Sequence, residues 1–553
     1  MRMRKILCFV FLSLIPSLVL AEPTAESMYL FLRSRFEEKA ARPEVALSLL
    51  KEAEVLDPTS SSIKTYLGLF YLKKGELEKA KAYIQGALEL DGKNDLALFL
   101  LAGIHSSEGD LETAIRLYER CIEVRPERKD AHLYLASLYL AKGEADKAIK
   151  TYESLLSFDE GNVIVLFYLG RIYAERKQYD KARECYGQIL QIDPTFEPAL
   201  IDLGLLYEIE GEEDKAFDLY RKVLESNPES REAKTRMANI FLRKKDYGNA
   251  LRQLEDVLKR EKDDLSIREK VGLLHLEMGR FDDAIVDFSL ILSKEPKNDI
   301  ARFYLAHALR EKGETQRAIE ELLKVDPGSD IFKDALRVMA FIFLRSDADE
   351  GIRVFQGLME KGIAHVEVLR YLSMLFEEKK EYAKALELLE EAIKREGKDP
   401  DLLYQLGVVY EKKGETDMAL RVMEEILSVD PDHPDALNFI GYTLAEAGKD
   451  LDRAEDMIVR ALKRKPDSGY IVDSLGWVYY RKGDLKAALE QITRAHELLP
   501  EDPTISLHLG QIYEDLGDWE KALQSYREAL SLEKDEKKRR EIEERIERVE
   551  KER

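Results

Sequence analysis

The chain has 553 residues, and its 108 Asp and Glu outnumber its 86 Lys and Arg, which gives a formal net charge of -22. Sequence-independent binding to nucleic acid needs a positive field, so this acidity argues against a nucleic-acid partner. Hydrophobic residues make up 45%, enough to bury a core, and three cysteines are too few for a disulfide framework.

Residues 1–21 have the pattern of a cleavable signal peptide. Basic residues precede an apolar run, and Val19-Leu20-Ala21 supplies the small residues that a signal peptidase reads. The alternative is a membrane anchor, but about 15 apolar residues are short for a hydrocarbon core roughly 30 Å thick. The sequence therefore predicts an exported protein whose mature chain begins at Glu22.

A small residue recurs every 34 residues through most of the remaining chain. Twelve residues before most of these positions stands another Gly or Ala. The first series includes Ala80, Ala114, Ala148, Ala182, Ala216, Ala250, Ala284 and Ala318. Glycines such as Gly75 and Gly143 follow the first half of a period, where a left-handed residue can end a helix. Each period therefore predicts two amphipathic helices, and such a pair buries its apolar face only by stacking on its neighbours.

This pattern resembles the tetratricopeptide repeat family over about residues 27–535. The resemblance implies an all-α fold, a right-handed α-solenoid (superhelix) of about 15 helix-turn-helix repeats. It divides into an N-terminal array, residues 22–330, and a C-terminal array, residues 366–535. Between them, residues 331–365 lose the 34-residue rhythm, which indicates either a degenerate repeat or a hinge.

Residues 536–553 are predicted to form a charged C-terminal helix. Ile542, Ile546 and Val549 recur at helical spacing and give it one thin apolar stripe, which can lie on the last repeat. The helix is then a solvating cap, and the alternative is a coiled-coil partner site.

Motifs for chemistry are not found in the sequence. It contains no glycine-rich nucleotide loop, no metalloprotease HExxH and no serine-hydrolase GxSxG, and its eight histidines are scattered over different repeats. Cys121 and Cys185 occupy apolar helix positions and are predicted to be small core residues. We therefore expect no catalytic residues, no metal site and no cofactor, and the protein is predicted not to be an enzyme.

A candidate binding surface comes from the family resemblance, because positions 2, 5, 9, 12 and 13 of each first helix line the concave groove of tetratricopeptide arrays. Trp477 stands at position 9, where other repeats have smaller or polar residues, so an exposed indole without a packing role is predicted there. Exposed amphipathic aromatics are typical binding anchors. The predicted partner-binding site comprises Asn438, Tyr442, Tyr470, Asp473, Trp477, Tyr480, Arg481, His508 and Gln511. The alternative is that these side chains fill a narrow superhelix interior.

The run Gly441-Tyr442-Thr443-Leu444, with Asp473-Ser474-Leu475-Gly476-Trp477 after it, is similar to a stretch in proteobacterial envelope tetratricopeptide proteins regarded as scaffolds or adaptors. The similarity implies a non-enzymatic scaffold of the bacterial periplasm or cell envelope, compatible with peripheral outer-membrane association. Such a scaffold would bind envelope proteins or peptides in its groove and serve assembly or turnover of an envelope machine. The alternative is a glycan-binding module in polysaccharide export or cell-wall metabolism. Partner identity and oligomeric state are left open.

Overall fold

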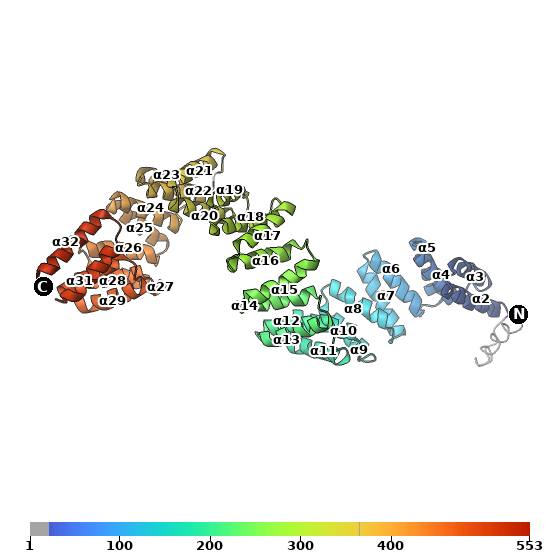
Figure 1. Cartoon of the computed structure of the whole chain (residues 1–553). Coiled ribbons are helices and arrows are strands. Elements are labelled where there is room, and N and C mark those ends of the chain that lie inside the picture. The colour runs from blue at the N-terminus through green and yellow to red at the C-terminus, as the bar shows by residue number, and fades with distance from the viewer. Residues whose placement is uncertain (1–21, 364, 553) are drawn as a thin grey trace. The chain divides into compact units, whose positions relative to one another are not determined.

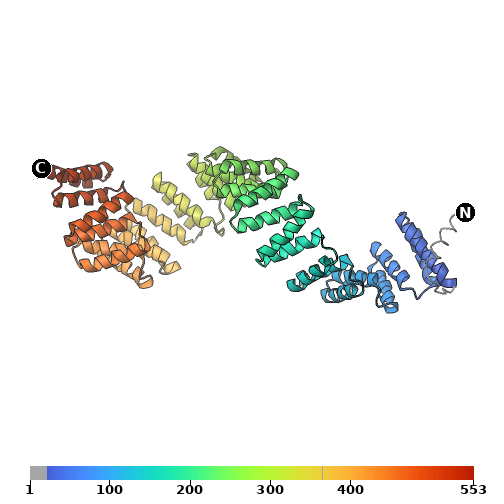
Figure 2. The same ribbon diagram turned by 90° about the horizontal axis from the view of Figure 1, so that it is seen from below.

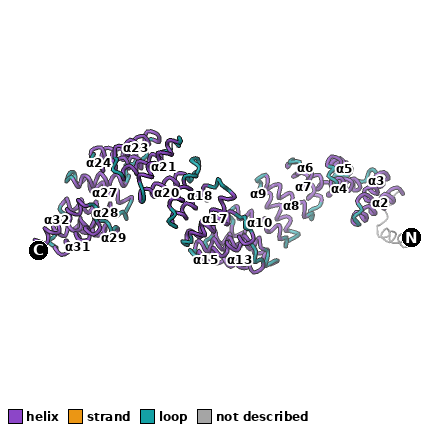
Figure 3. Tube along the Cα trace, turned by 45° about the horizontal axis from the view of Figure 1, so that its top comes forward, coloured by secondary structure: helices purple, strands orange, loops and turns teal. Residues whose placement is uncertain are grey.

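The computed structural model describes residues 22–363 and 365–552, and in these residues helices alternate with short turns (Figures 1 and 3). The predicted signal peptide lies outside the described residues. Within them, 31 helices form 15 antiparallel pairs followed by a single helix, α32. No described helix is long and apolar enough to cross a membrane. The prediction of an all-helical array of about 15 repeats is confirmed.

The chain divides into two compact units at Asp263 and Asp264. In the first unit seven pairs stack in sequence order, as the blue to green ribbons of Figure 1 show. Its helices are α2 (Glu22–Lys39), α3 (Pro43–Leu56), α4 (Ser61–Lys73), α5 (Leu77–Leu90), α6 (Asp95–Ser107), α7 (Leu111–Val124), α8 (Lys129–Ala141), α9 (Ala145–Leu156), α10 (Val163–Glu175), α11 (Tyr179–Ile192), α12 (Glu197–Ile209), α13 (Glu213–Ser226), α14 (Arg231–Arg243) and α15 (Tyr247–Arg260).

The second unit contains eight pairs and the final helix, and Figure 2 shows the same hairpins from below. Its helices are α16 (Leu265–Glu277), α17 (Phe281–Lys294), α18 (Asp299–Glu311), α19 (Thr315–Leu322), α20 (Phe332–Arg345), α21 (Ala348–Glu360), α22 (Val366–Glu378), α23 (Tyr382–Glu396), α24 (Pro400–Lys413), α25 (Thr416–Val429), α26 (Pro434–Glu446), α27 (Leu451–Arg464), α28 (Gly469–Lys482), α29 (Leu485–Leu498), α30 (Pro503–Asp515), α31 (Trp519–Leu532) and α32 (Glu536–Glu552).

The recurring small residues lie where the two helices of a pair approach most closely. A Cβ atom added at Gly170 would stand 2.5 Å from Tyr186 Cε1, and one at Gly510 would stand 2.5 Å from Tyr526. The alanines of the 34-residue series, such as Ala182, have no exposed surface. Small and large side chains therefore interlock within each pair, which fixes the packing of the helices.

The turn inside every pair except α20–α21 contains a residue in the left-handed conformation. Gly75, with φ of 76°, fills this role after α4, where glycine carries no Cβ penalty. After α10, α14 and α22 the same conformation is adopted by Lys177, Lys245 and Lys380, with φ of 57–59°. The turn geometry thus persists even where the sequence lacks the glycine that signals it.

The loss of rhythm near residue 330 corresponds to a shortened helix. Helix α19 has 8 residues, whereas the second helices of most pairs have 14, and residues 323–331 form turns before α20. The core continues through this segment, because Val325, Phe332 and Phe355 are buried. The irregular segment therefore folds as a helical pair, and its proposed role as a hinge stays a prediction.

Helix α32 lies on the last pair. Ile542 and Val549 are buried against Leu523 and Tyr526 of α31, and Ile546 packs beside them. The apolar stripe of this charged helix thus covers the end of the core, as the spacing of its three residues predicts.

Candidate functional site

A groove of about 710 Å³ lies on the first helices of four successive pairs, α24, α26, α28 and α30. Four of the nine predicted site residues line it: Asn438, Tyr442, Tyr470 and Asp473. The other lining residues are Tyr404, Glu411, Thr416, Asp435, Phe439, Thr443, Glu446, Ala447, Ser474, Asp502, Thr504 and Ile505. The structure thus brings residues from separate repeats to one surface.

The lining of this groove is acidic. It contains five carboxylates and no lysine or arginine; the carboxylates are Glu411, Asp435, Glu446, Asp473 and Asp502. Of these carboxylates, Asp435 is neutralised by Lys465 at 2.7 Å, and Asp473 is hydrogen-bonded to His508 at 2.9 Å. A surface of one sign attracts ligands of the opposite charge, so the groove favours a cationic ligand.

Aromatic and amide groups give the groove its contact surface. The ring of Tyr470 is 60% exposed, whereas Tyr442 is half-buried. Burial raises the pKa of Tyr442, and the carboxylates of Glu446 and Asp473 raise it further, so its phenol stays protonated and can donate a hydrogen bond. Asn438 Oδ1 is buried and has no hydrogen-bond partner among the described residues.

Trp477 lies in a buried stack beside the groove. Its side chain is 6% exposed, with its ring centroid 4.0 Å from that of His508 and 4.7 Å from that of Tyr480. The expectation of an exposed indole without a packing role is therefore wrong, because His508 of the next repeat packs against it. Its Nε1 donor has no partner among the described residues. Whether this indole contacts a partner stays a prediction.

A buried hydrogen bond joins two neighbouring first helices at this place. His508 Nδ1 of α30 lies 2.9 Å and 3.1 Å from the two carboxylate oxygens of Asp473 on α28. Both side chains are less than a tenth exposed. The pair aligns the two helices and connects the buried stack to the groove floor, since Asp473 belongs to both.

The remaining predicted residues are held by neighbouring groups. Arg481 Nη1 donates to the Glu446 carbonyl oxygen at 2.9 Å. The Gln511 side-chain oxygen accepts from Arg545 Nη2 of α32 at 2.9 Å when its amide is oriented to satisfy both groups. Burial and a hydrogen bond to the Asp515 carboxylate raise the pKa of Tyr480 to about 12.

The sequence analysis missed several groove residues. Tyr404 stands at position 5 of its first helix, as do Asn438 and Asp473, and Thr504 stands at position 2, as does Tyr470. Applying the position rule to one more repeat before Asn438, and to position 2 of the repeat that contains His508 and Gln511, would have found both. Arg545 could not be found in this way, because it lies outside the repeats.

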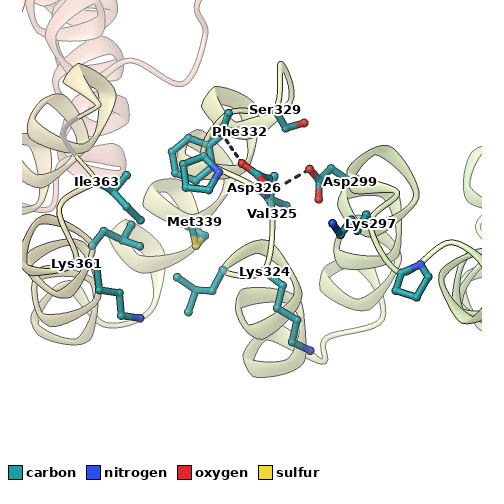
Figure 4. A pocket seen from close by; sticks show the side chains of 15 residues that line it. Lys297, Asp299, Lys324, Val325, Asp326, Ser329, Phe332, Met339, Lys361 and Ile363 are labelled. Atoms are coloured by element: carbon teal, nitrogen blue, oxygen red, sulfur yellow. Dashed lines mark hydrogen bonds between the residues drawn. The ribbon is translucent and has the colours of Figure 1, made fainter.

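A second cavity, of about 680 Å³, lies beside the irregular pair (Figure 4). Phe332, Met339 and Ile363 form an apolar part, and lysines stand at its edge. Lys324, one of them, is paired with Glu321 at 2.7 Å. The cavity adjoins the turns that replace the last residues of α19, and it contains none of the predicted site residues.

Metal-ligating side chains do not gather anywhere in the described parts of the chain in groups of three or more His, Cys, Asp or Glu. Cys121 and Cys185 are buried free thiols, in agreement with their predicted place in the core. Burial raises the pKa of both to about 11. The neutral thiols therefore act as small apolar residues.

Models of the tetratricopeptide repeat match along most of the array. The matched segments are residues 66–94, 106–162, 163–196, 197–230, 235–289, 275–328, 376–440 and 474–537. The chain belongs to the tetratricopeptide repeat family. It is therefore a repeat scaffold of a kind that binds proteins or peptides and is typically not catalytic.

A tetratricopeptide repeat-containing protein of Pseudomonas aeruginosa is 25% identical over 188 residues, 34% of this chain and 32% of that protein. The matched region thus spans about a third of the relative's length. Among solved structures, yeast Tom70 is 15% identical with a TM-score of 0.36, covering 89% of this chain and 96% of its own. YrrB, described as having an unusual peptide-binding site, is 18% identical with a TM-score of 0.30, covering 33% of this chain and 95% of its own. At TM-scores this low the likeness says nothing about function.

Proposed function

We propose that the protein is an exported, non-enzymatic scaffold whose groove on α24, α26, α28 and α30 binds a basic peptide segment of a cell-envelope protein. The observation that carries this proposal is the lining of the groove, which has five carboxylates and no basic residue. Charge complementarity of this kind speeds association and selects among partners. The signal-peptide pattern of residues 1–21 supports export.

Each group in the groove has a role in this proposal. The carboxylates of Glu411 and Glu446 are exposed and available to Lys or Arg side chains of the peptide. The exposed ring of Tyr470 can stack on a guanidinium or an aromatic side chain. The side-chain amide of Asn438 lines the groove and can form a hydrogen bond with the peptide. Together these contacts suit an extended or helical segment that lies across several repeats.

A peptide array tests the proposal. Purified chain is titrated with fluorescent 12-residue peptides that alternate Arg or Lys with aromatic residues, and with matched peptides carrying Glu in place of the basic residues. We expect the basic peptides to bind with an affinity that falls as salt is added. The double variant Glu411→Gln, Glu446→Gln should weaken them by about tenfold, which corresponds to about 1.4 kcal/mol.

A matched control removes the same number of negative charges as the test variant. Glu112 and Glu225 have side chains 77% and 69% exposed and lie on helices that contribute no residue to the groove. The double variant Glu112→Gln, Glu225→Gln should leave the affinity unchanged. Equal binding of basic and acidic peptides, or equal loss in both double variants, would contradict the proposal. A soluble glycan that binds and is lost with Tyr470→Ala would instead support the glycan-binding alternative.

A further inference from the structure

The first helix of the array leaves one apolar face uncovered. On α2 the side chains of Met28, Tyr29, Leu32 and Phe36 are exposed by 53%, 48%, 59% and 67%. The opposite face is packed, because Ser27 Oγ donates to the Ala53 carbonyl oxygen at 3.0 Å and Phe31 packs among the core residues of the first two pairs. Four large apolar side chains on one helix face form a patch of the kind that marks an interaction site.

The repeat itself shows what kind of surface this is. Tyr29 and Phe36 stand at positions 3 and 10, and 34 residues later the same positions hold Ile63 and Phe70, which are 3% and 6% exposed. The next repeats bury these positions too, with Ala97 and Ile104, Ala131 and Leu138, and Val165 and Ile172. In each later repeat a preceding helical pair packs against the first helix. The outer face of α2 therefore has the positions of a stacking face and, among the described residues, no helix on it.

The face is complementary to itself in an antiparallel arrangement. When two copies of α2 lie antiparallel about the midpoint between Leu32 and Arg33, Tyr29 lies opposite Phe36 of the partner subunit. In the same register Leu32 lies next to Leu32 of the partner subunit, at the two-fold axis. The contact between Tyr29 and Phe36 of the partner subunit occurs twice by symmetry, so apolar side chains meet at both ends of the patch.

We propose that the occupant of this face is a second copy of the chain, bound through an antiparallel, two-fold contact between the two α2 helices. A head-to-tail contact onto the last pair is disfavoured, because α32 covers that end with Ile542 and Val549 buried. A two-fold contact closes on itself and gives a dimer, not a filament. The dimer presents two grooves, and paired grooves raise the avidity for a partner with two binding segments.

The size of the face sets the strength of the contact. Helix α2 has 18 residues, and four large apolar side chains per copy give an interface at the small end of stable ones, about 1,200 Å² in total. We therefore expect a dissociation constant of the dimer in the micromolar range.

Sedimentation equilibrium of the purified chain tests the proposal, up to about 100 µM, where a micromolar dimer is nearly saturated. We expect a dimer, and Phe36→Glu should raise its dissociation constant by about 30-fold or more, as truncating a central anchor does. Ile209→Glu is the matched control, because Ile209 is 62% exposed on α12 and outside the face. A monomer at the highest concentration overturns the proposal.

Paired cysteines test the antiparallel register. In a mixture of chains that carry Tyr29→Cys and chains that carry Phe36→Cys, the two variants should cross-link to each other more readily than either does to itself, because the register places these two positions opposite one another. The cysteine variant Leu32→Cys should cross-link with a short bismaleimide, whereas Ile209→Cys should not. A dimer that survives Phe36→Glu, or a mixture of the Tyr29→Cys and Phe36→Cys chains that cross-links no better than either variant alone, assigns the contact to another surface or another register and overturns the proposal.

Discussion

Replacing Trp477 by alanine should destabilise the C-terminal repeats, because the indole is buried between neighbouring repeats. An aromatic side chain buries about 150–250 Å², which at about 25 cal/mol/Å² corresponds to about 4–6 kcal/mol as an upper limit. Its unpartnered Nε1 donor offsets about 1–3 kcal/mol of this, because burying an unsatisfied donor is unfavourable. We therefore expect Trp477→Ala to lower the free energy of local unfolding by about 3 kcal/mol, at the low end of measured values for such truncations.

Hydrogen exchange with mass spectrometry measures this locally, which suits an array in which repeats unfold in neighbouring groups. Peptides from α28, α29 and α30 should lose protection, and peptides from the first unit should not. Trp477→Phe is the control, since it keeps the stacked ring, removes the unpartnered donor and should cost less than about 1.5 kcal/mol. A loss below about 1 kcal/mol in Trp477→Ala would refute the assignment of Trp477 to the core, because surface substitutions stay in that range.

Three further predictions concern the array itself. Gly170→Ala should destabilise the protein by about 1–3 kcal/mol, because the added Cβ would overlap Tyr186. Gly187→Ala in α11, where the added Cβ meets open space, should stabilise the protein by about 0.5–1 kcal/mol. Urea unfolding of each variant measures both changes. Burial raises the pKa of Tyr152 from 10.0 to about 12. The free energy of unfolding that the protonated phenol contributes is therefore complete below pH 10 and is lost as the pH rises to about 12. Circular dichroism at high pH measures this loss, which Tyr152→Phe should reduce and an unchanged profile would contradict. Ile542→Ala should lower the free energy that holds α32 on the last pair by about 2–5 kcal/mol, which faster hydrogen exchange in residues 536–552 would show. Glu543→Ala, the control, should change this free energy by less than about 0.5 kcal/mol.

The fold could be predicted from the sequence because the repeat fixes the spacing of the residues at which the helices pack. The 34-residue spacing of alanines such as Ala114 and Ala148 fixes where two helices touch, and both are fully buried. The same reasoning holds for Ile542 and Val549, whose spacing alone indicates the buried stripe of α32. Where the rhythm fails near α19, the pattern could not say that a helical pair still forms, because turns and a shortened helix have no fixed period.

The candidate site was predicted only in part. Position numbers correctly point to Asn438 and Tyr470 as groove residues, because inner positions recur with the repeat. They fail for Trp477, since its burial depends on His508 in the next repeat, and a position rule treats each repeat alone. They also miss Arg545, which reaches Gln511 from a helix that has no place in the repeat.

The short helix α19 has a mechanical consequence. In an array whose pairs contact mainly their neighbours, a pulling force passes through every junction in turn, and the junction with the least packed surface yields first. Because α19 has 8 residues, its junction with α20 is the weak link of the second unit. Stretching would open the array there, and the groove on α24 to α30 would keep its shape under load.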